Sequence, residues 1–431
     1  MARTVLSGGR VFDGTGSAVA DADVVISDGT IVDVGIGLDG DESVDIRGLT
    51  VLPGFFDCHV HVMVSGIDLV RRLNRPFSYQ FFQAARNLGA TLDCGITTVR
   101  DAGGADLGVQ RAINDGLIDG PRMQIAISAL SQTGGHGDGW LPSGITTFLM
   151  SPHPGRPPGL ADGPEEVRKR VREIVRAGAN VIKVHTSGGV LSPRDSPKHA
   201  QFRPDELAAL MAEATAAGLP VMAHAQATDG IKNALLAGVR SIEHGIYLDD
   251  EAIDIMLRTG AWFVPTLVAP HAVVNAARAG SQLPDGVLAK AQDVIAAHAD
   301  AFARAAAAGV KIAMGTDSGV GPHGDNLDEL PLMAAGGMTP AQVLTATTRS
   351  AAELLGIGDE TGTIMAGKRA DLIVLAGDPY DLANLKANIF AVYAAGRKVR
   401  QRSRSDLGPQ LRRRDDLSPG VPLTTAQPAA S

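Results

Sequence analysis

Short segments of alternating apolar and polar residues fill the first 50 positions of the chain, and Asp-Gly turn pairs separate them. This pattern predicts the strands Thr4–Leu6, Arg10–Phe12, Ala22–Ile26, Thr30–Val34 and Ser43–Ile46. A second β-rich stretch near the other end comprises Ala370–Ala376 and Ile389–Val399, with Gly396 at a turn. Neither stretch is a complete domain by itself. We therefore expect one small β-sandwich domain composed of residues 1–52 together with residues 358–402.

Between these ends, residues 53–357 alternate short apolar segments with amphipathic helical ones, which is typical of a parallel sheet. The predicted strands are Leu52–His61, Ile96–Asp101, Met123–Ala129, Val181–Thr186, Val221–Ala225, Ser241–His244, Trp262–Leu267 and Ile312–Thr316. Predicted helices include Pro204–Ala217, Asp229–Ala237, Asp250–Thr259 and Ala289–Ala308. Eight such strands predict an α/β fold with a closed (β/α)8 TIM-like barrel. An open doubly wound sheet would need a glycine-rich turn after its first strand, where this chain has His59-Val60-His61.

Composition and charge exclude several classes of function and leave the predicted fold unchanged. Asp and Glu exceed Lys and Arg by 47 to 39, and the net charge of −8 argues against a nucleic-acid binder. The sequence has no apolar run of the roughly 18 residues that a membrane span needs. Two cysteines cannot form a disulfide framework. We expect a cytoplasmic protein without membrane contact, in which residues 403–431 form a flexible tail.

Two histidines end the first predicted barrel strand. His59 and His61 are two residues apart, so their side chains point to the same side of a strand. The carboxyl ends of barrel strands are where active sites of this architecture are built. A single histidine on a strand is usually structural, but this pair favours a metal site at the barrel mouth.

Further candidate ligands end later strands. His224 and His244 follow short apolar segments, and Asp317 follows the eighth strand in a Gly-Thr-Asp turn. Taken alone, each histidine equally fits a hydrogen-bonded core residue, and the aspartate fits a helix cap. Together with His59 and His61 they predict one metal site, because imidazole suits zinc and its first-row neighbours.

Lys183 lies within the apolar segment Val181–His185 of the fourth predicted strand. An unpaired buried ammonium group is unfavourable, so burial should lower its pKa. The neutral amine can react with carbon dioxide and form a carbamate, which is able to bridge two cations. The alternative is an ordinary ion pair with an acid such as Asp317 or Glu243.

Other polar residues are candidate substrate contacts. His136 lies on the glycine-rich loop Gly134–Asp138, where it is placed to polarise a carbonyl or to bind an anion. Arg100 ends the second strand beside Asp101, so that an ion pair between them and a contact with substrate are both open. Two further histidines are candidates for the pocket wall, namely His185 and His323.

Longer motifs surround these residues. They are Gly9–Gly16, Val51–His61, Thr97–Asp101, Gly134–Asp138, Ile182–Val190, Ser241–Gly245, Gly315–Gly319 and Gly362–Leu375. In these motifs, and over nearly its whole length, the chain resembles the amidohydrolase superfamily, most closely its prolidase-like and imidazolonepropionase-related branch. Members with this set of motifs hydrolyse Xaa-Pro and other dipeptides, N-acyl amino acids and some xenobiotic amides such as ochratoxin A. Related enzymes attack ureas and thiocarbamates.

The resemblance implies a binuclear centre of two divalent cations, expected to be zinc, in a homo-oligomeric enzyme. It implies one cation on His59, His61 and Asp317, a second on His224 and His244, and carboxylated Lys183 as the bridge. Imidazolonepropionase has a single metal and lacks the bridging lysine, so Lys183 argues against that activity.

One position departs from the family pattern. Dipeptidase members often read His-Ala-Tyr after the fifth strand, whereas this chain reads His224-Ala225-Gln226. Gln226 offers an amide in place of the phenol and is a further candidate substrate contact. A standard dipeptide pocket therefore does not follow from the resemblance, although the hydrolytic chemistry does.

These residues predict an enzyme that hydrolyses a carbon–nitrogen bond in a small-molecule amide or peptide. A metal-activated hydroxide attacks the carbonyl, His136 helps to stabilise the oxyanion, and Asp317 passes a proton to the leaving amine. The first hypothesis is a dipeptidase, a carboxypeptidase-like enzyme or an N-acyl amino acid hydrolase. The second is a hydrolase of xenobiotic amides, ureas or carbamates. A scaffold without catalysis is disfavoured because all six ligands are present, and a nucleic-acid deaminase because it would not need Lys183.

Overall fold

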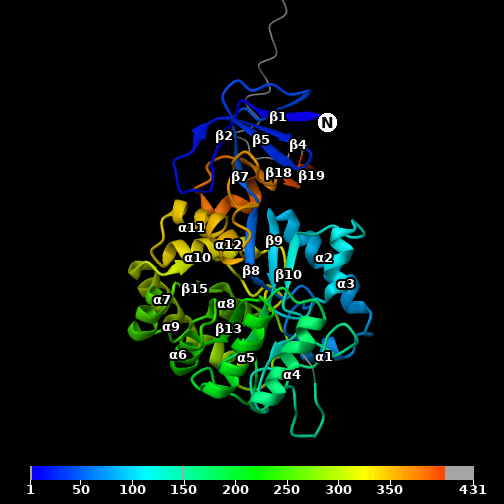
Figure 1. The fold of residues 1–431 in the computed structure, drawn as a ribbon, viewed down its shortest axis with the longest axis vertical. Helices are drawn as coiled ribbons and strands as arrows, with labels where there is room; N and C mark the ends of the chain where they lie inside the picture. The colour runs from blue at the N-terminus through cyan, green and yellow to red at the C-terminus, as the bar shows by residue number, and fades with distance from the viewer. Residues whose placement is uncertain (1, 148–149, 403–431) are drawn as a thin grey trace, which may run out of the picture.

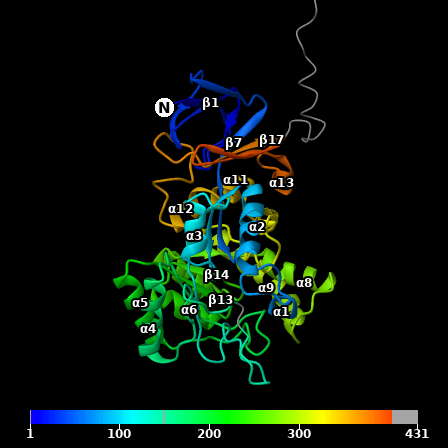
Figure 2. The same cartoon turned by 90° about the vertical axis from the view of Figure 1, so that its right-hand side faces the viewer.

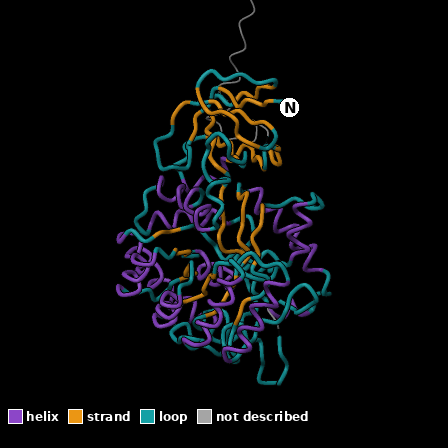
Figure 3. The backbone as a smooth tube through the Cα atoms, viewed as in Figure 1, coloured by secondary structure: helices purple, strands orange, loops and turns teal. Residues whose placement is uncertain are grey.

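The computed structural model describes residues 2–147 and 150–402, and the predicted flexible tail at 403–431 lies outside them. Strands from both chain ends lie together at the top of Figure 1, above a larger part in which helices surround central strands. Figure 3 separates the two parts by their secondary structure, because strands dominate the upper part and helices the lower. In the described part of the chain, no helix is both long and apolar enough to cross a membrane.

Two sheets form the part built from the chain ends. Their strands are β1 (Arg3–Ser7), β2 (Arg10–Val11), β3 (Ala20–Asp21), β4 (Asp23–Ser27), β5 (Thr30–Gly35), β6 (Glu42–Asp45), β7 (Leu49–Pro53), β17 (Leu372–Ala376), β18 (Ile389–Ala394) and β19 (Arg397–Gln401). One sheet has the order β5-β4-β1-β6 and the other β19-β18-β17-β7-β2-β3. Buried side chains from both sheets, including Leu6, Val24 and Val374, belong to one apolar cluster. The composite sandwich and its boundaries stay predictions that this arrangement supports.

The two ends of the chain meet where β7 pairs with β17. The two strands run antiparallel, with Leu52 opposite Ile373. Figure 2 shows these two strands side by side above the helices. The expected turn at Gly396 is present between β18 and β19, and its φ of 73° is a conformation that glycine adopts without strain.

Parallel strands fill the centre of the larger part. They are β8 (Phe55–Val60), β9 (Ile96–Asp101), β10 (Arg122–Ile125), β11 (Ala129–Leu130), β12 (Ile182–His185), β13 (Val221–Ala225), β14 (Ser241–His244), β15 (Trp262–Val264) and β16 (Lys311–Ile312). They form one sheet of order β10-β9-β8 and another that runs from β11 to β16 in sequence order. Every pair in both sheets is parallel, as the alternating pattern predicted.

The strand ladders do not close into one continuous barrel, which differs from the prediction. The first interruption lies between β10 and β11, where Ile127 has a φ of 65° and breaks the extended backbone. The second lies between β16 and β8, where single backbone hydrogen bonds replace a ladder, such as the 2.7 Å bond from Asp317 N to the His59 carbonyl. The predicted strand Met123–Ala129 is consequently two short strands.

Gly54 divides the first predicted strand, Leu52–His61, into β7 and β8. A Cβ atom at this position would lie 2.1 Å from Thr97 Oγ1, so only glycine lets the chain pass this close to β9. β7 joins the sheet of the chain ends, while β8 joins the central strands. The division leaves His59 and His61 at the carboxyl end of β8.

Helices cover the central strands in the order that the alternation predicts. They are α1 (Leu69–Leu73), α2 (Tyr79–Asp93), α3 (Leu107–Asn114), α4 (Gly163–Arg176), α5 (Pro204–Ala216), α6 (Thr228–Ala237), α7 (Asp250–Thr259), α8 (Val268–Arg278), α9 (Val287–Ala308), α10 (Glu329–Ala335), α11 (Pro340–Ala346) and α12 (Arg349–Leu354). A further short helix, α13 (Leu385–Asn388), lies between β17 and β18 in the part built from the chain ends. α7 has the predicted bounds because both of its ends are capped. The Asp249 side chain accepts from Ala252 N, and Gly260 closes the helix with a φ of 71°.

Candidate active site

Four histidines from β8, β13 and β14 lie close together. His59 and His61 are at the end of β8, His224 is on β13 and His244 ends β14. Ring centroids are 5.5 Å apart for His59 and His61, 4.9 Å for His59 and His244, and 4.6 Å for His224 and His244. The structure therefore brings together the four histidines that the sequence singled out.

Each of these rings has one nitrogen engaged by the protein. The bonds join His59 Nδ1 to Glu243 Oε2 (2.7 Å), His61 Nδ1 to the Gly103 carbonyl (2.8 Å), His224 Nε2 to the Gly188 carbonyl (3.2 Å) and His244 Nδ1 to Thr266 Oγ1 (2.7 Å). A carbonyl or carboxylate only accepts, so the bonded ring nitrogen of His59, His61 and His224 donates. In a neutral ring the second nitrogen then keeps a lone pair. Burial lowers the pKa of His59, His224 and His244 well below the usual value. Neutral rings with one free nitrogen are the form that binds a metal.

Asp317 lies beside two of these rings. Its Oδ1 is 3.3 Å from His61 Nε2 and 3.6 Å from His59 Nε2. Burial raises the pKa of Asp317, but the hydrogen bond with His61 and the nearby charges of His59 and Lys183 outweigh it, so the pKa lies below its usual value. His59, His244 and Asp317 each place one potential ligand atom within 4.8 Å of those of the other two. This spacing is compatible with one shared cation.

The backbone is strained at two of these positions. His244 has a φ of 71° and Asp317 a φ of 60°. Left-handed conformations of this kind cost about 1–3 kcal/mol each in residues other than glycine and concentrate at functional sites. The chain next to Asp317 is held by Asp57, whose carboxylate accepts the Thr316 hydroxyl at 2.6 Å. Burial raises the pKa of Asp57 to about 6.

Lys183 on β12 is 2% exposed and has no hydrogen bond or ion pair with any residue that the structure describes. The expected alternative, an ion pair with Asp317 or Glu243, is not formed, because Glu243 pairs with Arg100 and His59 instead. Burial lowers the pKa of Lys183 to about 8, against the opposing charges of Glu243 and Asp317. A buried amine without a partner has the properties that carbamate formation requires.

Sequence reasoning missed the role of Glu243, which is fully buried between two candidate residues. Its Oε1 accepts from Arg100 Nη2 at 2.9 Å and its Oε2 bonds to His59 Nδ1. Of the two possibilities left open for Arg100, the ion pair with Asp101 is not formed, because the Asp101 carboxylate accepts backbone N–H groups instead. A glutamate inside a short strand and directly before His244 is the signal in the sequence that could have revealed this role.

The sequence model of the amidohydrolase family matches residues 50–400, which include all six candidate ligands. The chain belongs to the amidohydrolase family. Among curated relatives of this amidohydrolase, ochratoxinase of Aspergillus niger is 36% identical over 400 residues, covering 88% of this chain and 82% of the relative. Imidazolonepropionase of Pseudomonas putida (strain GB-1) is 25% identical over 414 residues, covering 86% and 92%.

Solved structures give the same assignment. A Xaa-Pro dipeptidase with bound methionine in the active site superposes on the amidohydrolase with a TM-score of 0.84 at 34% identity, over 92% of this chain and 99% of the other. A prolidase complexed with N-methylphosphonate-L-proline gives a TM-score of 0.85 at 36% identity, over 93% and 100%. The amidohydrolase is thus an enzyme of a family that acts on amide and other carbon–nitrogen bonds.

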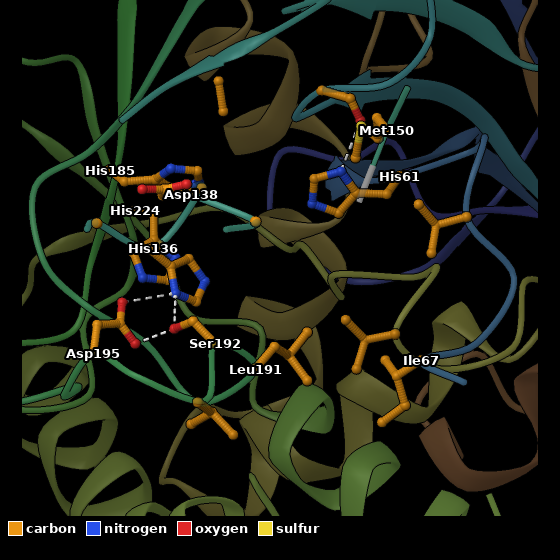
Figure 4. A pocket seen from close by; sticks show the side chains of 18 of the residues that line it. His61, Ile67, His136, Asp138, Met150, His185, Leu191, Ser192, Asp195 and His224 are labelled. Atoms are coloured by element: carbon orange, nitrogen blue, oxygen red, sulfur yellow. Dashed lines mark hydrogen bonds and ion pairs between the residues drawn. The ribbon is translucent and has the colours of Figure 1, made fainter. Parts of the chain in front are cut away.

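His136 of the amidohydrolase lies beyond the strand ends and stacks on His224, with ring centroids 4.2 Å apart and planes 20° from parallel. Figure 4 shows its Nδ1 directed at Ser192 Oγ (2.8 Å) and Asp195 Oδ2 (3.2 Å). A Cβ atom at Gly189 would lie 2.3 Å from His136 Cε1, so the ring packs on bare backbone. Ser192, Asp195 and Gly189 were not anticipated, because they come from a loop without a periodic pattern.

A cavity of about 1100 Å³ extends from the histidines, slightly larger than the roughly 300–1,000 Å³ of most small-molecule sites. His136, His185 and Gln226 line it, as expected. Within the described chain, His185 Nδ1 and Gln226 Oε1 are buried and have no hydrogen-bond partner. Arg100 and His323 do not line the cavity, which corrects both expectations: Arg100 is buried against Glu243, and His323 Nε2 bonds to a backbone carbonyl.

Proposed function

We propose that this amidohydrolase uses two divalent cations to cleave the amide bond of an N-acyl amino acid or a dipeptide. The observation that carries the proposal is the convergence of four imidazoles, Asp317 and the unpartnered Lys183 at the carboxyl ends of the central strands. Their nitrogen and oxygen donors fit zinc and its first-row neighbours. The residues that would hold the cations are His59, His61 and Asp317 for one, His224 and His244 for the other, and carboxylated Lys183 between them.

Bound cations supply Lewis-acid activation of a water molecule and of the amide carbonyl. Asp317 accepts the proton of the attacking water and delivers it to the leaving nitrogen, which completes the hydrolysis to an acid and an amine. His136 donates a hydrogen bond to the carbonyl oxygen as negative charge develops there. Asp195 holds the His136 ring in place through its Nδ1, and Glu243 fixes the orientation of His59.

The second candidate is hydrolysis of bulky xenobiotic amides, ureas or carbamates. Gln226 favours it, because an unpaired amide stands where dipeptidase members often have tyrosine. The 36% identity with ochratoxinase also favours it. A cytoplasmic location and a homo-oligomeric state stay predictions for either candidate.

The test is mass spectrometry of a pooled library of dipeptides, N-acyl amino acids, aryl ureas and carbamates after incubation with the zinc-loaded enzyme. We expect cleavage confined to compounds with a free α-carboxylate. Cleavage of ureas or carbamates that lack this group would transfer the assignment to the second candidate. Enzyme dialysed against a chelator is the control, and cleavage that survives its use would contradict metal dependence.

A further inference from the structure

The cavity wall carries more charged side chains than the proposed chemistry uses. Arg156 donates to the carbonyls of Gly104 and Ser151, and Arg170 to the Leu160 carbonyl and Glu173. Arg194 lies over the Trp140 ring at 4.7 Å. Among the described Lys and Arg residues that line the cavity, Lys183 and Arg72 then have no partner. Lys183 belongs to the candidate metal site, so we consider Arg72 on α1.

Arg72 has two buried donors that nothing in the described chain accepts. Its Nε and Nη1 are inaccessible to solvent and lack any hydrogen-bond partner. Burial lowers the pKa of the guanidinium, and the charge of Asp68 opposes this only through space. An arginine nevertheless stays protonated, so the enzyme holds a partly buried cation with two unmet donors beside its cavity. A carboxylate is the acceptor whose two oxygens match this planar fork.

His136, the other candidate for a substrate anion, already faces a carboxylate. Asp195 Oδ2 is 3.2 Å from its Nδ1, and Lys290 Nζ is 3.7 Å from Asp195 Oδ1. A substrate carboxylate at His136 would meet the charge of Asp195 at short range, whereas a polarised carbonyl oxygen carries only part of a charge. This arrangement favours the carbonyl for His136 and leaves the free acid to Arg72.

We propose that Arg72 binds a free carboxylate of the substrate. The proposal rests on the proposed function and deepens it, because it makes the substrate an amide that carries an acid group. Ile67, Leu69 and Val70 lie close to Arg72 in the sequence and line the same cavity. The hydrocarbon next to the carboxylate packs against this apolar wall, as in an N-acyl derivative of a large apolar amino acid.

The test compares N-(2-naphthoyl)-L-phenylalanine with its C-terminal primary amide, which has the same shape and no charge. Release of 2-naphthoic acid by the zinc-loaded enzyme gives kcat and KM. Isothermal titration with the D-enantiomers of both probes measures binding independently of turnover. The variant is Arg72→Gln, and Arg71→Gln is the matched control, because Arg71 is an exposed neighbour on the same short helix.

We expect the wild type and Arg71→Gln to prefer the acid over the amide. In Arg72→Gln, KM and Kd for the acid rise about 10-fold or more, the scale of a lost charged hydrogen bond, while the values for the amide stay unchanged. Equal affinity of the wild type for both probes would overturn the proposal, as would equal losses for both in Arg72→Gln. Acid-selective binding without any cleavage would support Arg72 and contradict the proposed function, so the two failures are distinguishable.

Discussion

The two sides of the cavity differ in how completely the protein satisfies its own polar groups. At the strand ends, the buried acids Asp57, Asp101 and Glu243 all accept hydrogen bonds from the protein. At the loop and helix side, buried polar atoms of Arg72 and Gln226 have no partner in the described chain.

This contrast separates two tasks. A fully bonded buried network is rigid, and it leaves free only the atoms that a cation needs. Unmet donors and acceptors are unfavourable until a ligand pairs with them, so they select for a ligand with complementary groups. We infer that the strand ends carry the proposed reaction, while the loop side selects the substrate.

Among substitutions at the strand ends, we expect Asp317→Asn to cause the largest loss of activity. The asparagine side chain cannot take up the proton of the attacking water. We expect kcat to fall about 10²–10⁴-fold, the usual contribution of a general acid–base group. Far-ultraviolet circular dichroism and the Tm check that the variant folds. Asp325→Asn changes an exposed acid on a neighbouring loop and should retain activity. Wild-type turnover in Asp317→Asn would remove Asp317 from the mechanism.

We expect Glu243→Gln, also at the strand ends, to lower the stability of the folded enzyme. The substitution leaves the buried Arg100 guanidinium without a compensating charge, which costs about 3–5 kcal/mol when one partner of a buried pair is lost. The free energy of unfolding, measured with denaturant, reports the loss. Glu353→Gln removes an exposed partner of Arg349 and should cost about 0.5 kcal/mol or less. Similar losses in both variants would show that the buried pair is not a stabilising feature.

The sequence predicted the strand side better than the loop side for a physical reason. The alternation of a strand fixes the face on which His59 and His61 lie, and Ser241–His244 ends where its apolar run ends. The sequence suggested Lys183 as a partner for Glu243, whereas the actual partner Arg100 is 143 residues away and only folding brings it close. Loop residues such as Asp195 follow no period, so only the folded chain brings them to His136.

A test with carbon dioxide examines Lys183, a group on the strand side that has no partner in the described chain. Enzyme reloaded with zinc in bicarbonate buffer should bind two equivalents, because the carbamate of Lys183 completes the bridge. In buffer depleted of carbon dioxide, the second equivalent should bind more weakly, as measured by elemental analysis after gel filtration. Lys183→Met should abolish the difference. Two equivalents under both conditions would contradict a carbamate.

The smallest effect is expected on the loop side. In Asp195→Asn the hydrogen bond to His136 loses its charge, so we expect kcat to fall about 10-fold with little change in KM. Ser192→Ala removes the neutral contact to the same ring nitrogen and should have a smaller effect. If Ser192→Ala impairs kcat more than Asp195→Asn, the serine and not the aspartate positions His136.

The antiparallel pairing of β7 with β17 also constrains the order in which the chain can fold. On a ribosome that adds about 5–20 residues per second, roughly 15–65 s separate the synthesis of Leu52 from that of its partner Ile373. Throughout this interval β17 is missing from the edge of β7 with which it later pairs. β7 leads directly into β8, the strand that carries His59. The nascent enzyme therefore exposes an unpaired edge prone to aggregation until its last strands emerge, and we expect newly made chains to depend on chaperones.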